Sequence, residues 1–137
     1  MKLTENFTLE ELISSSTAKI KHIDNTPDSV QLANLQRLCV EILQPIRDRM
    51  CGPVTITSGF RSKRLNKAVR GVPTSQHTTG EAADIISGDN KKLWDVICRL
   101  VCEGIITVGQ LIDEKNLKWI HISLPNDKHR NQILRIP

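Results

Sequence analysis

The stretch SQHTTGEAADI, residues 75–85, places His77 seven positions before Asp84, with Gly80 between them. Its second half, AADII, has the apolar and β-branched composition of a short strand. An ionised carboxylate close to a hydrophobic core is unfavourable unless it is paired with another group or bound to a cation. We therefore expect the Asp84 carboxylate to have a paired group or a bound cation near this strand. His77 by itself is an ordinary loop histidine.

A second histidine lies in the stretch KWIHISL, residues 118–124, which alternates as a half-buried strand does. The alternation separates a polar-bearing face from an apolar one, with Trp119, His121 and Ser123 on the first and Ile120, Ile122 and Leu124 on the second. If the isoleucines face the core, His121 faces a groove. On its own, a solvent-facing strand histidine is the simpler interpretation.

Two histidines and an aspartate are residue types that bind zinc. Catalytic zinc sites use three protein ligands and keep a fourth position for water, whereas structural sites are normally closed by four ligands. His77, Asp84 and His121 would supply such a three-ligand set. The His-x6-Asp spacing is not specific, so the residues by themselves leave open both a metal site and a chance arrangement.

The length and composition are those of one globular domain. The chain has 137 residues, of which 39% are hydrophobic, and we expect a single domain over residues 1–137. The net charge of +4 and the pI near 9.0 favour an anionic partner. The basic residues are dispersed and aromatic residues make up only 3%. The chain therefore has few aromatic side chains on which the bases of single-stranded nucleic acids could stack, and no nucleic acid partner is expected.

The chain carries no apolar run long enough to span a bilayer, and its first residues, MKLTENFTLEELI, lack the apolar stretch of a secretory signal. We therefore expect no membrane insertion and synthesis in the cytoplasm. We also expect the protein to be a monomer. The cysteines, Cys39, Cys51, Cys98 and Cys102, show no close Cys-x-x-Cys pair. Packing is the expected role of Cys98 and Cys102, although a disulfide between two of the four remains open.

Helices are predicted mainly in the first part of the chain. Thr8 and Glu11 form a capping box that begins a short helix. Residues 14–25 are polar and predicted to be irregular, and Thr26-Pro27-Asp28 has the pattern of a helix start. A buried stripe at helical spacing follows: Leu32, Leu35, Leu38, Cys39, Ile42, Leu43 and Ile46. We expect Pro45 to kink this helix or to close it early.

Strands are predicted mainly in the second part. We expect strands at residues 53–57 and 82–86, separated by a surface excursion with a helical turn at 65–69. An amphipathic helix with apolar residues from Leu93 to Val101 should end at Gly104. The expected remaining elements are a hairpin of residues 106–113 and 118–124, and a last strand at 132–136. This order predicts an α+β domain with a small antiparallel sheet and flanking helices.

Several motifs together carry a resemblance to a known family: FTLEEL (7–12), NTP (25–27), LQPIR (43–47), SGFRS (58–62), LN (65–66), SQHTTGEAADI (75–85) and WIHIS (119–123). The chain resembles the zinc metallopeptidases that include D-alanyl-D-alanine carboxypeptidases, dipeptidases and phage L-alanyl-D-glutamate endolysins. It is most similar to their single-domain carboxypeptidase-like branch, and the hedgehog signalling domain is a distant relative. The resemblance implies the fold of that group and one zinc ion, bound by His77, Asp84 and His121.

The resemblance also implies a role for Arg61, in SGFRS. It matches an arginine that lies near the substrate in relatives, where a guanidinium can hold a carboxylate or oppose charge on a carbonyl oxygen. Without the resemblance, Arg61 would be a solvated loop end. We further expect Ser75 to brace the His77 loop by a hydrogen bond, and Gly80 to permit its turn.

A zinc peptidase also needs a general base that takes the proton of the attacking water and passes it to the leaving amine. In several relatives an acidic residue lies three positions before the last histidine ligand, but this chain has Lys118 there. The QLI-x-E pattern points to Glu114, with Asp113 as the alternative. Both acids are also consistent with simple turn residues. His129 falls beyond the matched motifs and is taken as a surface residue.

The sequence thus predicts a zinc-dependent peptidase that acts on peptidoglycan stem peptides, either as a carboxypeptidase or as an endopeptidase. Because no export signal is found, we expect a phage or prophage endolysin that stays in the cytoplasm until lysis, or a virion-associated lytic protein. A housekeeping carboxypeptidase would normally need a signal or an anchor. The alternative, favoured by Lys118, is a catalytically weak or inactive zinc-binding module of a phage particle.

Overall fold

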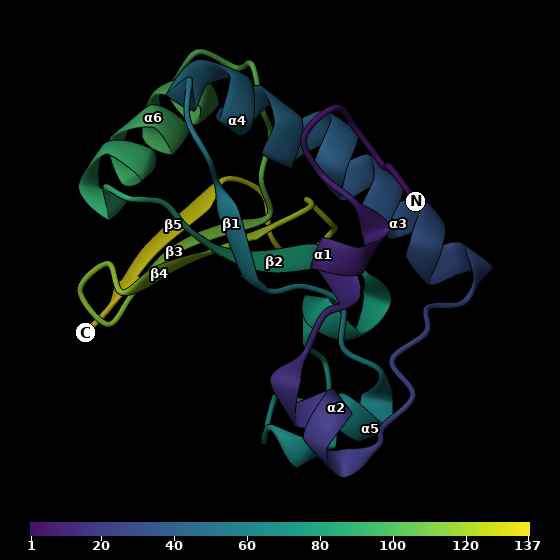
Figure 1. Ribbon diagram of the computed structural model, residues 1–137. Helices are drawn as coiled ribbons and strands as arrows, with labels where there is room; N and C mark the ends of the chain where they lie inside the picture. The colour runs from purple at the N-terminus through teal and green to yellow at the C-terminus, as the bar shows by residue number, and fades with distance from the viewer.

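The strands that carry Asp84 and His121 lie side by side in the centre of a five-stranded sheet. The computed structural model describes residues 1–137. Its strands are β1 (Thr55–Ser58), β2 (Ala82–Ile86), β3 (Gln110–Glu114), β4 (Trp119–Ser123) and β5 (Gln132–Ile136), in the spatial order β1-β2-β4-β3-β5 (Figure 1). The α+β class is confirmed. The predicted strand boundaries move slightly, since β1 begins at Thr55 and residues 106–109 precede β3 rather than belong to it.

The sheet is mostly antiparallel, as predicted, and one pair at its edge is parallel. The predicted hairpin of β3 and β4 is present, and β2 pairs antiparallel with both β1 and β4. β5 pairs parallel with β3. After β4 the chain returns to the end of the sheet where β3 begins, and there Gln132 N–H donates to Gly109 O. β5 therefore runs in the same direction as β3.

The helices are α1 (Leu9–Ile13), α2 (Ser16–Lys21), α3 (Ser29–Leu38), a π-helical segment η1 (Cys39–Leu43), α4 (Gln44–Met50), α5 (Lys63–Ala68), a 3-10 turn η2 (Gln76–Thr79) and α6 (Asn90–Cys102). The longer helical segments α3, α4 and α6 lie along one side of this sheet, whereas α2 and α5 lie together below it in the view of Figure 1. The last helix ends as predicted, because Gly104 follows it with a φ of 72°. None of these helices combines the length and apolar character needed to cross a membrane.

Two predictions for the N-terminal third are wrong. Residues 14–25 are not irregular throughout, since α2 forms there with Ser15 as its cap and Ala18 buried. The next helix begins at Ser29 rather than after Thr26, because the Asp28 side chain accepts a hydrogen bond from Gln31 N–H and Gln31 reciprocates in a capping box. The predicted capping box at Thr8 is confirmed.

Pro45 does not close the long helix early; of the two predicted outcomes, the structure shows a local distortion just before the proline. Proline has no N–H for the α-helical hydrogen bond, so the helix must adjust before it. It widens into the π turn η1, in which Gln44 N–H donates to Cys39 O, and then continues as α4 to Met50. α3, η1 and α4 therefore form one interrupted helical rod along the sheet.

The core lies between the sheet and the rod formed by α3, η1 and α4, together with α6. From the sheet it takes the inward side chains of Ala83, Ile85, Leu111, Ile120 and Ile122, all fully buried. From the helices it takes Leu35, Leu38, Ile42, Ile46, Leu93, Ile97 and Leu100, among others. Because β-strand side chains alternate, the residues between the inward ones point to the other face of the sheet. That second face carries the candidate site.

The cysteines form no disulfide. Cys39 is buried in the core, Cys98 is half-buried, and Cys51 and Cys102 are exposed. The predicted packing role is confirmed for Cys98, which is partly buried, but it is wrong for Cys102, which is exposed. The fully packed cysteine is Cys39.

Candidate metal centre

Asp84 and His121 meet because β2 and β4 are neighbours in the sheet. The two residues are direct partners in the antiparallel register. Ile120 and Ile122 are fully buried on the core side, so His121 projects from the opposite face, as the alternation predicted. The side chains of Asp84 and His121 are 17% and 15% exposed, which places them at the base of a depression rather than on open surface.

His77 reaches the same point from the turn η2, which immediately precedes β2. Ser75 caps this turn, and its hydroxyl accepts a hydrogen bond from His77 N–H at 3.2 Å, as predicted. Gly80 ends it with a φ of 80°, and a Cβ there would lie 2.6 Å from Gln31 O. The left-handed conformation and the close packing on α3 together explain why this position is a glycine.

The orientation of His77 is fixed by the backbone of the β1 end. Its Nδ1 lies 2.7 Å from Gly59 O. A carbonyl oxygen can only accept a hydrogen bond, so Nδ1 carries the proton and the neutral ring keeps its lone pair on Nε2. Hydrogen bonds of this kind set the tautomer of metal-binding histidines. His77 is thereby prepared to use Nε2 as a ligand atom.

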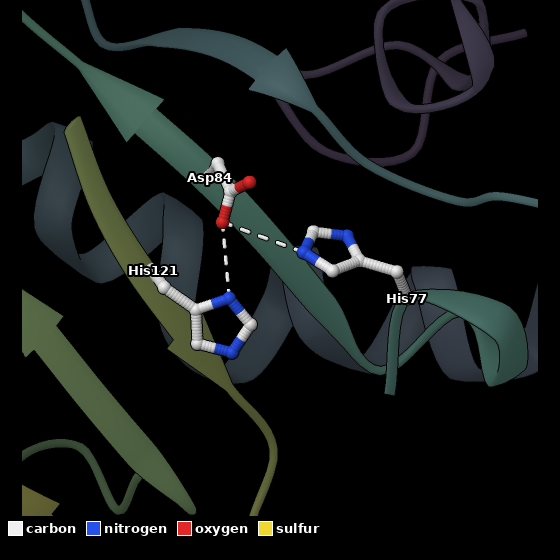
Figure 2. Close-up of side chains that lie close together, drawn as sticks. All are labelled: His77, Asp84 and His121. Carbon is white, nitrogen blue, oxygen red and sulfur yellow. Dashed lines mark hydrogen bonds and ion pairs between the residues drawn. The ribbon is translucent and has the colours of Figure 1, made fainter. Parts of the chain in front are cut away.

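The three side chains converge on one carboxylate oxygen (Figure 2). Asp84 Oδ1 lies 3.0 Å from His121 Nδ1 and 3.4 Å from His77 Nε2. One potential ligand atom from each residue lies within 4.8 Å of the other two. Lone pairs of two neutral imidazoles and a carboxylate repel one another unless protons or a cation lie between them. The group therefore fits a metal ion by its chemistry as well as by its spacing.

The Asp84 carboxyl is ionised at neutral pH. Burial taken alone would raise its pKa. Hydrogen bonds with His121 and His77, and the charges these rings can carry, outweigh burial and hold the pKa of Asp84 well below its usual range. A metal ligand must be deprotonated, so Asp84 is in the required form.

These residues open into a polar cleft of about 820 Å³. Its base holds His77, Asp84 and His121, and Arg61, Glu114 and Trp119 also line it. One wall is formed by residues 69–72 and 74–76, and another by residues 126–129. The volume lies within the range of roughly 300–1,000 Å³ that holds a drug-sized ligand. The cleft can therefore hold a short peptide above the three-residue group.

Arg61 is tied to the metal group through the backbone. Its N–H donates to His77 O at 3.0 Å. The side chain lines the cleft, and its Nε is buried without a hydrogen-bond partner. Burial lowers the pKa of the guanidinium, whereas the nearby Asp84 charge raises it. A buried, unpaired donor in a cleft differs from a solvated loop end and is suited to receive an acceptor from a ligand.

The two acidic candidates on β3 face opposite sides of the sheet. Glu114 lines the cleft, and it pairs with Trp119 two residues along β4 from His121. Asp113 points to the other face, where its Oδ1 accepts a hydrogen bond from Leu117 N–H at 2.6 Å. The structure therefore brings Glu114, and not Asp113, to the metal group. Strand alternation separates them, although they are adjacent in sequence.

Sequence reasoning missed part of the cleft. His129, taken as a surface residue, lines it together with Asn126, Asp127 and Lys128. The segment turns inward because the Asn126 side chain accepts hydrogen bonds from the N–H groups of Lys128 and His129. The Asn-Asp pair was the only available signal, since such residues start tight turns. Lys118 is not among the residues that line the cleft.

The fold and the site together define the class of a metallopeptidase. A sequence profile of the peptidase M15 family matches residues 5–123. The chain belongs to this peptidase M15 family. M15 peptidases are zinc enzymes, and the membership supports a zinc peptidase that acts on peptidoglycan. No curated protein matches the chain.

Proposed function

We propose that this protein is a zinc-dependent peptidase that hydrolyses bonds in peptidoglycan stem peptides, as a phage or prophage endolysin does. The observation that carries the proposal is the convergence of His77, Asp84 and His121 at the base of a cleft that Glu114 also lines. Three ligands leave a coordination position free, which is the arrangement of a catalytic rather than a structural zinc.

The chain's own residues have distinct tasks in this proposal. His77 Nε2, His121 Nδ1 and an Asp84 oxygen would hold one zinc ion. When bound, zinc would supply polarisation of the scissile carbonyl and a more acidic attacking water.

Glu114 takes the proton of that water and returns it to the leaving amine, because it is the acidic residue on the cleft side of β3. Arg61 directs its unpaired Nε–H toward the developing oxyanion or toward a substrate carboxylate.

Cleavage within the stem peptide is our preferred form of the reaction. Residues 69–72 and 126–129 also line the cleft, which supports the binding of a peptide with residues on both sides of the scissile bond. Peptidoglycan is anionic, and the net charge of +4 supports binding to it. A protein released from the cytoplasm by lysis, or a virion-associated one, would reach this substrate.

The test is a combined measurement of zinc content and peptide cleavage. Purified protein is expected to hold one zinc ion per chain and to release amines from peptidoglycan, with mass spectrometry identifying the bond that is cut. The variant His121→Ala should lose both zinc and activity. His22→Asn is the matched control, since His22 lies outside the cleft at a left-handed helix end that asparagine tolerates.

A second candidate function rests on Lys118. If a base is required three positions before His121, the domain would bind zinc without efficient hydrolysis and would act as a binding or structural module of a phage particle. Zinc at unit stoichiometry with no cleavage product would favour this candidate. Absence of bound zinc would contradict both proposals.

A further inference from the structure

The loop Val69–Val72 forms one wall of the cleft and carries an arginine, Arg70. Val69 and Val72 are exposed beside it, at 38% and 66%. The wall therefore combines a cation with two apolar side chains. This combination suits a carboxylate that is attached through a short aliphatic stem, because the stem can contact the valines while the carboxylate reaches the guanidinium.

The loop is held in place from below by Asn66, a polar residue that is only 3% exposed. Asn66 Nδ2 donates to Val72 O at 3.0 Å, and Gly71 N–H donates to Asn66 O at 2.8 Å. A Cβ at Gly71 would lie 2.0 Å from Asn66 Oδ1, so the loop packs directly on this side chain. The backbone of Arg70 is thereby ordered before any ligand binds, which lowers the entropy lost on binding.

Arg70 has no partner for its charge within the chain. Its φ of 60° belongs to the left-handed residue that ends α5, where Arg70 N–H donates to Lys67 O and Gly71 N–H donates to Asn66 O. Its guanidinium forms no hydrogen bond or ion pair, whereas Arg37 and Arg49 each pair with a glutamate. The backbone therefore directs an unpaired positive charge into the lining of the cleft, where a ligand can supply the acceptor.

The charges of the cleft leave this arginine available. The cleft carries the cations Arg61, Arg70 and Lys128 and the carboxylates of Asp84, Glu114 and Asp127. Asp84 is committed to the metal group, and Glu114 lies on β3 rather than on the wall. Lys128 and Asp127 are neighbours in sequence in the segment 126–129 and carry opposite charges. Among residues 69–72 and 74–76, which line the same part of the cleft, Arg70 is charged and no carboxylate neutralises it.

We propose that Arg70 and its loop form a subsite that binds a free carboxylate of an acidic peptide substrate, away from the scissile bond. This inference rests on the proposed peptidase function. The planar guanidinium can bind a carboxylate through two parallel hydrogen bonds, which a carboxamide cannot reproduce with the same charge. The carboxylate belongs either to an acidic residue within the peptide or to its C-terminus.

The experiment compares four synthetic stem peptides with lysine at the third position. The first peptide has a free carboxylate on the D-glutamate at position two and a free C-terminal carboxylate. The second has only the D-glutamate carboxylate converted to an amide, the third only the C-terminal carboxylate, and the fourth both. Affinity is measured by calorimetry at one temperature and salt concentration. For the native protein, amidation of one of the two carboxylates is expected to weaken binding about tenfold, which also identifies the group that is bound.

Variants at Arg70 then test which residue is responsible. Arg70→Gln should bind the free and amidated peptides equally, and Arg70→Lys should retain part of the difference. Arg64→Gln is the matched control, since Arg64 is an exposed residue of α5 outside the cleft and the charge change is the same. It should discriminate as the native protein does.

Arg70→Gly separates binding from folding. Glycine accepts the left-handed conformation without strain, so this variant should melt no lower than the native protein while losing the discrimination. The proposal is overturned if the native protein does not distinguish the peptides, or if Arg70→Gln still does. If the native protein neither bound zinc nor hydrolysed peptide, the proposed peptidase function would be overturned instead. Failure of the Arg70 subsite and failure of the peptidase function are therefore distinguishable.

Discussion

Asp84 owes its position to two neighbours that are distant in sequence from each other. His121 reaches it across the β2–β4 pair, and His77 reaches it from the turn just before β2. A carboxylate in a strand of otherwise apolar residues is unfavourable without such partners. The same contacts that hold the pKa of Asp84 low also make it an anionic ligand, so its stability and its proposed role have one physical cause.

Glu114 and Asp113 offer a test at the scale of single residues. Glu114→Gln removes the proposed base while preserving its size, and kcat should fall by about 10²–10⁴-fold with zinc content unchanged. Asp113→Asn removes the same charge one residue earlier, on the other face of β3. It retains an oxygen that can accept from Leu117 N–H, so kcat and thermal stability should stay close to native values.

Steady-state kinetics on a stem peptide, with zinc measured in parallel, decide between the two residues. Full activity of Glu114→Gln would remove Glu114 from the mechanism. A large loss of kcat in Asp113→Asn would contradict the separation of the two acids by strand alternation.

At the scale of elements, the end of β1 supports the metal group. Gly59 brings this segment against α1, and its carbonyl holds His77 Nδ1. A Cβ at Gly59 would lie 2.2 Å from Leu12 O, a backbone atom that cannot move aside without shifting the helix. The contact between α1 and β1 therefore determines the orientation of a ligand that neither element carries.

Gly59→Ala should consequently impair both folding and metal binding. We expect a loss of about 1–3 kcal/mol in the free energy of unfolding from overpacking. Displacement of the carbonyl from His77 should weaken zinc affinity by about 10–100-fold.

Denaturant unfolding and a competitive zinc chelator measure the two effects of Gly59→Ala. Gly88→Ala is the control, because a Cβ at Gly88 meets no atom within 4 Å. If Gly59→Ala bound zinc with native affinity, the supporting role of this contact would be disproved.

The π turn gives a second test at this scale, through Cys39. Burial raises the pKa of its thiol to about 12, and the nearby Glu11 charge adds to the shift. The thiol therefore stays neutral in the folded protein, and only the thiolate reacts readily. In the native state a thiol reagent at pH 8 should modify the exposed Cys51 and Cys102 but not Cys39, which should react only after unfolding.

The same shift has a consequence for stability at high pH. The unfolded chain ionises Cys39 near the usual thiol pKa, while the folded chain resists ionisation up to about pH 12. The free energy of unfolding should therefore decrease as pH rises above roughly 9. Rapid labelling of Cys39 in the native state would show that the π turn opens.

At the scale of the whole molecule, the sheet separates two functions. One face packs on the rod formed by α3, η1 and α4, and on α6, and forms the core, while the other presents the metal group and the cleft. The three proposed zinc ligands come from η2, β2 and β4, so a bound ion would join the central strands to the preceding turn. Metal binding and folding should therefore be coupled.

Zinc is accordingly expected to stabilise the native protein. At a free zinc concentration about one hundred times Kd the gain is roughly 2.7 kcal/mol. For a domain of this size that gain corresponds to a rise in Tm of roughly 10 °C. Calorimetric melting with zinc and with a chelator measures it, and His121→Ala should melt at the same temperature in both. An unchanged Tm in the native protein would contradict the metal site.

The sequence by itself determined the features that depend on local pattern. Alternation in WIHIS placed His121 opposite the buried isoleucines, and the capping box at Thr8, the helix end at Gly104 and the strand around Asp84 follow from local residue types. The motif order indicated the metallopeptidase family, which the profile match supports independently.

Only the tertiary structure decided what depends on contacts between distant segments. It put β5 parallel to β3, brought His129 into the cleft, and left Asp113 on the far side of the sheet. It also showed that α3 continues through Pro45 by way of a π turn, since packing along the sheet outweighs the lost hydrogen bond. These outcomes depend on how segments that are distant in sequence pack against each other. The spacing of residues along the chain does not determine this packing.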